Sequence, residues 1–299
     1  MRKLKIGTRE SRLAIAQTRI VIDKVRERYP DLELEMVTIK TSGDLILDRA
    51  LDQVGGKGLF IKEIELALLQ GTIDLAVHSM KDLPVQIAPG LTIAAISERE
   101  DPRDVLVSRA GATLVELPAG AVVGTSSLRR SKQLLALRPD LTIRLLRGNI
   151  VTRLEKLAQH QYDAIILAAA GLKRLGLQDR ITQYFAVEEM IPAVCQGFLA
   201  IETRRDDDAG FLKETVHCEE GAVCAKAERG FLIRLNGGCS VPMGAHAVTD
   251  GDCLKITGML AANDRPEIYR ATVAGPVAQG KALGERLAEQ ILAQSGGVR

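Results

Sequence analysis

The chain has 299 residues, of which 46% are hydrophobic and 26% are charged, and its formal net charge is only +2. This is the composition of an ordinary globular protein of two or three domains, and so small a net charge excludes a chain that binds polyanions over its whole surface. Tryptophan is absent and aromatic residues make up 3% of the chain, which argues against a stacking surface for single-stranded nucleic acid.

Simple patterns exclude four further classes. The N-terminal stretch MRKLKIGTRES has no apolar segment behind its basic residues, and no apolar run approaches the ~20 residues of a membrane span. We therefore expect a cytoplasmic protein without membrane partners. The five cysteines are odd in number and include no CxxC pair, so we expect neither a disulfide framework nor a metal site.

The N-terminal part of the chain alternates between apolar strands and amphipathic helices. Strands are predicted over residues 4–8, 32–39 and 74–80, and helices over 61–71 and from the capping residue Ser11 to Tyr29. Between them, GGKGLF (55–60) lacks the spacing of a phosphate-binding loop. We expect this stretch to be a lid that carries Lys57.

The alternation restarts after ISEREDPRD (96–104), a charged stretch with a proline that is typical of a linker. Strands are predicted at DVLVSR, AVVGT, LTIRLL and YDAIILAAAG, with helices starting near Ser127, Asn149 and Asp179. Strands that alternate with helices predict parallel sheets joined by right-handed crossovers. We therefore expect two α/β domains with a cleft between them.

The C-terminal part of the chain changes character. Helices are predicted over residues 219–235 and 277–296, and three strands lie within 244–274, a segregated arrangement that is typical of α+β domains. The expected organisation is a first α/β domain formed by residues 1–97 and 198–216, a second α/β domain at 103–192, and a small α+β domain at 219–299.

Basic residues follow the predicted strands in four separate loops. GTSSLRR (124–130), for example, places hydroxyl groups and two arginines at a helix N-terminus, where the helix dipole already favours an anion. Because ligands of open α/β sheets bind at the carboxyl ends of strands, these loops predict a site for a ligand with several negative groups. The candidate residues are Arg9, Ser11, Arg12, Thr125, Ser127, Arg129, Arg130, Arg147, Arg153, Lys173 and Arg174.

HSMKDLP (78–84) adds Lys81 and Asp82 at the end of an apolar strand. Two interpretations stay open for this pair. The first is a structural salt bridge. The second is a carboxylate at Asp82 that faces a cleft, where it stabilises positive charge or moves a proton. His78 is expected to pack within its strand.

The stretch NGGCSVPMG (236–244) encloses a cysteine between glycines and a proline. Glycine permits unusual backbone angles and proline stiffens the chain, so we expect this loop to present Cys239 to solvent. The other four cysteines are expected to be small buried hydrophobes.

The chain resembles the porphobilinogen deaminase (hydroxymethylbilane synthase) family in six stretches, in this order: VGGKGLFIKEIE, AVHSMKDLP, GTSSLRR, RGNIVTRLEKL, PAVCQG and NGGCSVP. The resemblance covers nearly the whole chain. It implies a three-domain transferase of tetrapyrrole biosynthesis, and its first two domains are expected to be similar to periplasmic binding proteins. Such an enzyme condenses four porphobilinogen molecules onto a covalent dipyrromethane cofactor and releases hydroxymethylbilane and ammonia.

The resemblance also implies roles for individual residues. It makes Asp82 the catalytic residue and Cys239 the residue that holds the dipyrromethane through a thioether. The only partner it implies is the small-molecule substrate, without nucleic acid, and we expect a monomer. The residues implied to bind the cofactor and the substrate are Arg9, Ser11, Lys81, Thr125, Ser127, Arg129, Arg130, Arg147, Arg153 and Arg174.

Two positions depart from the family pattern. Cys195 stands where the family usually has glycine, and Phe198 is bulkier than the usual alanine, which leaves the motion of this segment in question. From the residues alone, two other functions also stay open. One is a non-catalytic anion receptor, which would leave Cys239 without a purpose. The other is a nucleic-acid binder, which the small net charge and the scarce aromatic residues disfavour.

Overall fold

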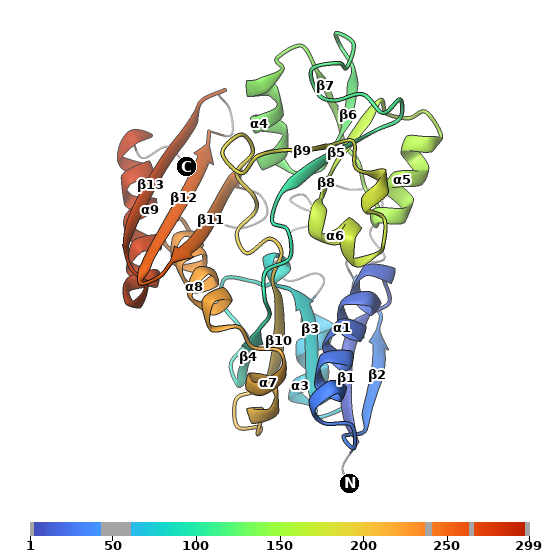
Figure 1. The fold of residues 1–299 in the computed structure, drawn as a ribbon, viewed down its shortest axis with the longest axis vertical. Coiled ribbons are helices and arrows are strands. Elements are labelled where there is room, and N and C mark those ends of the chain that lie inside the picture. The colour runs from blue at the N-terminus through green and yellow to red at the C-terminus, as the bar shows by residue number, and fades with distance from the viewer. Residues whose placement is uncertain (1–2, 43–60, 237–240, 263–265, 297–299) are drawn as a thin grey trace. The chain divides into compact units, whose positions relative to one another are not determined.

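The computed structural model describes residues 3–42, 61–236, 241–262 and 266–296 (Figure 1). The chain divides into two compact units. Unit 1 consists of Met1–Leu47, Gly56–Glu100 and Gly197–Ala222, and unit 2 consists of Asp48–Gly55, Asp101–Gln196 and Val223–Arg299. The three-domain boundaries expected from the sequence stay a prediction.

Unit 1 is built on a five-stranded mixed sheet with the strand order β2-β1-β3-β10-β4. β1 is parallel to β2 and β3, but β10 is antiparallel to both of its neighbours. The expectation of a parallel sheet is therefore wrong for β10, because this strand enters beside the carboxyl end of β3, with Leu199 opposite Ser79, and runs back along it. The strands are β1 (Leu4–Arg9), β2 (Leu34–Ile39), β3 (Leu75–Ser79), β4 (Leu91–Ile96) and β10 (Leu199–Arg204).

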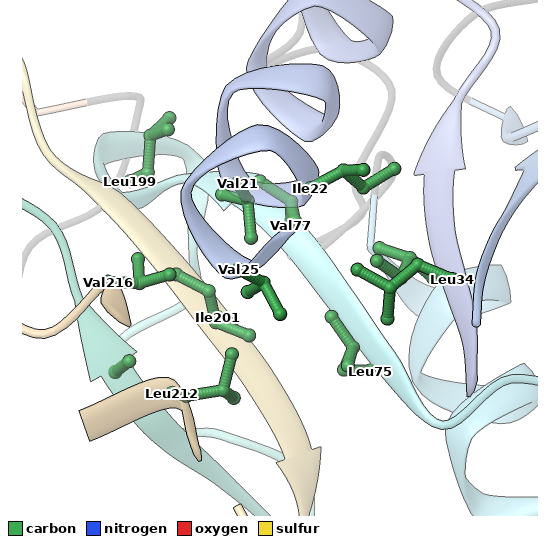
Figure 2. Packing of buried hydrophobic residues seen from close by; sticks show 12 residues of the cluster. Val21, Ile22, Val25, Leu34, Leu75, Val77, Leu199, Ile201, Leu212 and Val216 are labelled. Atoms are coloured by element: carbon green, nitrogen blue, oxygen red, sulfur yellow. The ribbon is translucent and has the colours of Figure 1, made fainter. Parts of the chain in front are cut away.

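One face of this sheet is covered by α1 (Arg12–Arg28) and by the short helix α7 (Gly210–Thr215). Figure 2 shows Val21, Ile22 and Val25 of α1 together with Val77 and Ile201 of the strands, all members of one buried cluster. Burying each such side chain stabilises the fold by about 1.5–3 kcal/mol. This packing fixes α1 against the strands that precede and follow it in the chain.

The start of α1 is fixed by a capping bond that the sequence predicts. Ser11 Oγ accepts a hydrogen bond from the Ala14 N–H at 3.2 Å, which satisfies one of the unpaired N–H groups of the first helical turn. Because β1 ends at Arg9, the cap holds Arg9 and Ser11 together at the carboxyl edge of the sheet.

The opposite face of the sheet is covered by α3 (Lys62–Leu69), whose Ile64 and Leu68 are fully buried against residues that include Ala76 of β3. The helix ends before Gly71, as the sequence predicts, and this glycine has a φ of 69°. Since both faces are covered, β3 is buried along nearly its whole length and consists mainly of apolar residues.

The larger sheet of unit 2 is also mixed, with the strand order β7-β6-β8-β5-β9. β6 is parallel to β7 and β8, whereas β5 is antiparallel to β8 and β9, so the expected parallel sheet is wrong for β5 as well. The strand β5 follows directly from residues 101–103 and enters the sheet beside the carboxyl end of β8, with Asp104 opposite Ala168. The strands are β5 (Asp104–Ser108), β6 (Val122–Gly124), β7 (Thr142–Arg144), β8 (Ala164–Ala168) and β9 (Gln183–Tyr184).

The helices of this sheet follow the sequence signals with two exceptions: a short helix begins at Ala169, inside the stretch predicted as a strand, and the helix expected near Asp179 does not form. α4 (Leu128–Leu137) is capped by Ser127 and α5 (Ile150–Ala158) by Asn149, as predicted, and the short α6 (Ala169–Arg174) follows β8. The helix expected near Asp179 is only a 3-10 turn, Gln178–Arg180. That expectation is wrong because β9 begins only a few residues later and leaves no room for a full α-helical turn.

A second, three-stranded antiparallel sheet in unit 2 is formed by β11 (Met243–Asp250), β12 (Cys253–Ala261) and β13 (Ile268–Pro276). It is accompanied by α8 (Glu219–Arg234) and α9 (Gly280–Gln294), which confirms the predicted small α+β fold. The two helices approach closely at Gly284, where a Cβ would lie 2.0 Å from the Ala227 carbonyl oxygen, so only glycine fits there.

Cys195 has an unusual backbone conformation. It is buried, and its φ is 60°, in the left-handed region that glycine adopts freely and other residues adopt at a cost of roughly 1–2 kcal/mol. A buried carboxylate holds it there, because the Cys195 N–H donates to Glu228 Oε2 at 2.6 Å, while Glu228 Oε1 accepts from the Ala247 N–H at 2.8 Å. The departure from glycine noted in the sequence therefore falls on a position whose backbone favours glycine.

Replacing Cys195 by glycine is expected to give a protein about 1 kcal/mol more stable than replacing it by alanine. Alanine must adopt the left-handed backbone, whereas glycine adopts it freely, and the larger unfolded-state entropy of glycine, about 0.4–1 kcal/mol, offsets only part of the gain. Urea unfolding of the two variants measures the difference. As a control, Ala288→Gly inside α9 should lose about 1 kcal/mol. An alanine variant at position 195 as stable as the glycine variant would contradict the strain.

Candidate functional site

In unit 1 an open pocket of ≈ 410 Å³ lies where the parallel strands β1 and β3 end. The structure thus brings three of the predicted residues, Arg9, Ser11 and Asp82, into one pocket. Its polar lining consists of Arg9, Ser11, Gln17, His78, Ser79 and Asp82, and its apolar lining of Leu13, Ala14, Ile61 and Val77.

Asp82 is presented to this pocket by a short 3-10 turn, Met80–Asp82, directly after β3. Met80 and Leu83 are buried on either side of the exposed Asp82, and the Met80 N–H donates to the Phe198 carbonyl oxygen at 3.0 Å. Lys81, in the same turn, is half-buried. Because the neighbouring side chains face the core, the carboxylate of Asp82 is directed away from it and remains accessible to a ligand.

In unit 2 the predicted residues stand at the carboxyl ends of β6, β7 and β8, which run parallel. After β6, Thr125 Oγ1 accepts from the Ser127 N–H at 3.1 Å, and Ser127 Oγ accepts from the Arg130 N–H at 3.4 Å. Both hydroxyl oxygens therefore hold the start of α4, while each hydroxyl keeps its own hydrogen for donation.

Arg129 and Arg130 are bound to a carboxylate of the protein itself. Both are buried, at 5% and 6% exposure, and both point to Asp104, the first residue of β5, which is fully buried. Arg129 Nη1 donates to Asp104 Oδ2 at 2.6 Å, and Arg130 donates from Nε and Nη2 to Oδ1 at 3.0 and 2.7 Å. The sequence predicts that these arginines need a negative partner, and the structure provides one within unit 2.

The charge of Asp104 is stabilised strongly by this arrangement. Burial by itself raises the pKa of the Asp104 carboxyl, but the charges and hydrogen bonds of Arg129 and Arg130 outweigh it and hold the pKa far below its usual range. Burial lowers the pKa of Arg129, an effect that the negative charge of Asp104 opposes. The cluster is therefore a buried, fully ionised group of one carboxylate and two guanidinium ions.

The two arginines differ in how many nitrogens they have available. All three guanidinium nitrogens of Arg130 donate within unit 2, since Nη1 also donates to the Ile166 carbonyl oxygen at 3.1 Å. Arg129 uses Nη1 for Asp104 and for the Ile191 carbonyl oxygen at 2.6 Å. Within the described ranges, no hydrogen bond from Arg129 Nε or Nη2 is found. Arg129 is thus the better placed of the two to bind a further anion.

Sequence reasoning missed Asp104, although a signal for it exists. An acid at the start of DVLVS, a strand that is otherwise apolar, requires a cationic partner once the strand is buried. Gln196 completes the set, because its Nε2 donates to Asp104 Oδ1 at 3.0 Å and to the Pro102 carbonyl oxygen at 2.7 Å.

Three further predicted arginines of unit 2, Arg147, Arg153 and Arg174, are half-buried. Arg147 precedes α5, and Arg153, in its second turn, donates from Nε to the Gly148 carbonyl oxygen at 2.7 Å. Arg174 ends α6, after β8. The structure therefore places each of them beyond the carboxyl end of a strand, as the sequence predicts. Two predicted residues, Cys239 and Lys57, lie outside the described residues.

Fold and site together define a class of protein. The chain is an α/β protein whose parallel strands end in cationic and hydroxyl side chains, with one exposed carboxylate, a set suited to a small ligand with several acidic groups. The family match is more specific: residues 4–211 match the porphobilinogen deaminase, dipyromethane cofactor binding domain, and residues 222–293 match the porphobilinogen deaminase, C-terminal domain. The chain belongs to the porphobilinogen deaminase family.

Full-length relatives agree with this assignment. The chain is 49% identical over 299 residues to a porphobilinogen deaminase of Geobacter sulfurreducens, covering 99% of this chain and 93% of the relative. It is 51% identical over 292 residues to that of Syntrophotalea carbinolica (97% and 93%), and 50% identical over 299 residues to that of Brevibacillus brevis (99% and 96%). A solved arginine-specific periplasmic binding protein of Salmonella typhimurium matches with 16% identity and a TM-score of 0.39, over 71% of this chain and 90% of that one.

Family membership confirms the predicted transferase of tetrapyrrole biosynthesis and its dipyrromethane cofactor. It leaves the anion receptor and the nucleic-acid binder without support. Among the helices that the structure describes, none combines the length and the apolar character needed to cross a membrane.

Proposed function

We propose that this chain condenses four porphobilinogen molecules in sequence, with loss of ammonia at each step, and releases hydroxymethylbilane. The observation that supports this most directly is the pocket of unit 1, in which the guanidinium group of Arg9 and the carboxylate of Asp82 occur together. Porphobilinogen carries an acetate, a propionate and a pyrrole N–H, and these three groups need the cationic donors and the acceptor that this pocket contains.

The chemistry of the available side chains also fits the dipyrromethane cofactor. Like the substrate, this group combines carboxylates with pyrrole N–H groups, and it supplies, when bound, the pyrrole carbon to which the first substrate unit is added. Cys239 is the proposed attachment point through a thioether. The side chains proposed to hold the carboxylates of cofactor and substrate are Arg9, Ser11, Lys81, Thr125, Ser127, Arg129, Arg130, Arg147, Arg153 and Arg174, with Lys57 on a lid.

Within this set, we assign different tasks to the two arginines of α4. Arg129 keeps donors that are not used within the described residues, so it binds a carboxylate directly. Each of the three guanidinium nitrogens of Arg130 already donates to Asp104 or Ile166, so Arg130 acts mainly by holding Asp104 and, through it, Arg129 in place.

Asp82 is proposed to act on the positive charge that develops when ammonia leaves. Loss of ammonia from the aminomethyl group leaves an electron-poor pyrrole whose N–H is a strong hydrogen-bond donor. A carboxylate that accepts this hydrogen bond stabilises the charge, and one such contact contributes roughly 3–4 kcal/mol to lowering the barrier. The exposed position of Asp82, at a fixed turn, suits this role.

A comparison of intact masses tests this proposal. The purified protein should be heavier than its sequence by two pyrrole units. The Cys239→Ser variant should lack this excess mass, and it should no longer release ammonia from porphobilinogen. Cys253→Ser, a change at an exposed cysteine of β12, is the matched control and should leave both unchanged. Active protein at the bare polypeptide mass would refute the proposal. The cytoplasmic location and the monomeric state stay predictions.

A further inference from the structure

His78, which lines the same pocket, forms a buried pair with Glu202. His78 is the fourth residue of β3 and Glu202 lies on the neighbouring strand β10. His78 Nε2 is 3.0 Å from Glu202 Oε2, and the two residues are 6% and 0% exposed. They are separated by 124 positions in the sequence, so the pairing exists only in the folded protein.

The hydrogen bond to Glu202 determines which ring nitrogen of His78 carries the hydrogen. An ionised carboxylate only accepts, so Nε2 must carry the hydrogen, and in the neutral ring Nδ1 is then a proton acceptor. His78 lines the pocket that contains Arg9, Ser11 and Asp82. Among the described residues, no hydrogen bond to His78 Nδ1 is found. The pocket therefore contains a second group, besides Asp82, that is able to take up a proton.

Burying this pair is costly for a position with only a packing role. Glu202 has apolar neighbours in the sheet, such as Ala76 opposite it, and its Oε1 is buried without a hydrogen-bond partner in the described part of the chain. A buried carboxylate left partly unsatisfied costs several kcal/mol, which an apolar residue at the same place avoids. Buried ionisable groups beside a pocket are typical of functional sites.

A second carboxylate, Glu65 on α3, faces the pair from the helix packed on this side of the sheet. Burial raises the pKa of Glu65, and the negative charge of Glu202 raises it further. The ionisable groups around His78 are therefore Glu202 on β10 and Glu65 on α3, with Arg9 and Asp82 in the pocket.

We propose that His78, oriented by Glu202, accepts the proton that each condensation releases, which leaves Asp82 as a fixed negative charge. This inference rests on the proposed function. It assigns proton acceptance to His78 and charge stabilisation to Asp82. A new C–C bond forms between the methylene carbon of the incoming unit and the α-carbon of the terminal substrate ring. That α-carbon then loses its proton to His78 Nδ1, the C–H electron pair restores the aromatic ring, and the imidazolium passes the proton to water. The arrangement, an imidazole held by a buried carboxylate, is that of a general base.

His78→Ala tests the proposal, with His217→Ala as the matched control. His217 is also in unit 1, but its Nδ1 accepts from the Ile96 N–H and its Nε2 contacts Glu219 outside the pocket. His78→Ala is expected to lower kcat by about 10²-fold or more, with little change in KM, and added imidazole should restore at least a tenth of the lost rate. His217→Ala should keep its rate and show no response to imidazole.

Glu202→Gln provides an independent test that keeps the imidazole. An amide can donate to the ring as well as accept from it, so the tautomer is no longer fixed. The proposal predicts that kcat of the wild type declines at low pH, and in Glu202→Gln this decline should shift or disappear. Glu65→Gln should leave that decline in place. If His78→Ala does not fold, His78→Gln replaces it in this test. The decline of kcat at low pH is expected to be lost in His78→Gln as well.

The outcomes separate the two proposals. The intact mass of each variant is measured first, so that a failure of cofactor attachment is not mistaken for slow proton transfer. If the wild type releases no ammonia from porphobilinogen, the proposed function fails. If the wild type is active and a cofactor-loaded His78→Ala protein keeps its kcat, the role of His78 is refuted. A slow His78→Ala protein that ignores imidazole and keeps the acidic decline shows a packing role and refutes it equally.

Discussion

Asp104→Asn is expected to destabilise the protein by about 3–5 kcal/mol, because it leaves the guanidinium groups of Arg129 and Arg130 buried without a counter-charge. Urea unfolding measures the loss. Asp140→Asn is the matched control, since Asp140 pairs with Arg138 at the surface and exposed pairs contribute little. Equal stability of the two variants would contradict the assignment of Asp104 as the anchor of the arginine cluster.

The same cluster predicts how stability depends on pH. The pKa of Asp104 in the folded protein lies far below that of an unfolded aspartate, which is about 4. Its stabilising contribution is therefore complete above pH ~4 and is lost as the pH falls from there towards the folded value. The stability difference between the wild type and Asp104→Asn should narrow as the pH is lowered from 7 to 3, measured by thermal unfolding. A difference that stays constant over this range would show that the charge of Asp104 is not its source.

Asp82→Asn is expected to lower kcat by about 10²–10³-fold while changing stability by less than about 0.5 kcal/mol. The side chain is exposed at a turn whose backbone is fixed by its neighbours, so the substitution removes charge without disturbing the fold. Steady-state ammonia release and thermal unfolding measure the two effects.

Asp179→Asn, an exposed acid in the 3-10 turn before β9, is the control for this change and should be neutral in both measurements. If Asp82→Asn keeps the wild-type kcat, Asp82 is a structural partner of its neighbours, which is the first of the two interpretations that the sequence leaves open.

Local signals predicted most elements of this fold, because they act over a few residues. Ser11, Ser127 and Asn149 each cap the helix that follows them, and the apolar run of β3 lies where both faces of a sheet are covered. Strand direction was not predictable in this way. β5 and β10 run antiparallel to their neighbours because the chain enters each sheet from the opposite edge, and that path depends on segments far away in the sequence.

The candidate site shows the same difference between features that local signals predict and features that depend on residues far apart in the sequence. The rule that ligands bind at the carboxyl ends of strands placed Arg9 and Asp82 correctly at one edge of one sheet. It did not reveal Asp104 as the partner of Arg129, nor Glu202 as the partner of His78, since these pairs form between residues 25 and 124 positions apart. From the sequence alone His78 is an ordinary strand residue, and only the burial of Glu202 beside it indicates a titratable pair.

The central claim is that substrate units are added one at a time to a chain that stays bound to the protein. Intact mass spectrometry after addition of porphobilinogen in small excess tests it most directly. We expect a ladder of species above the cofactor-loaded protein, separated by one pyrrole unit and ending before the linear tetrapyrrole is released. A single unchanged protein mass throughout turnover, with product accumulating in solution, would contradict the claim.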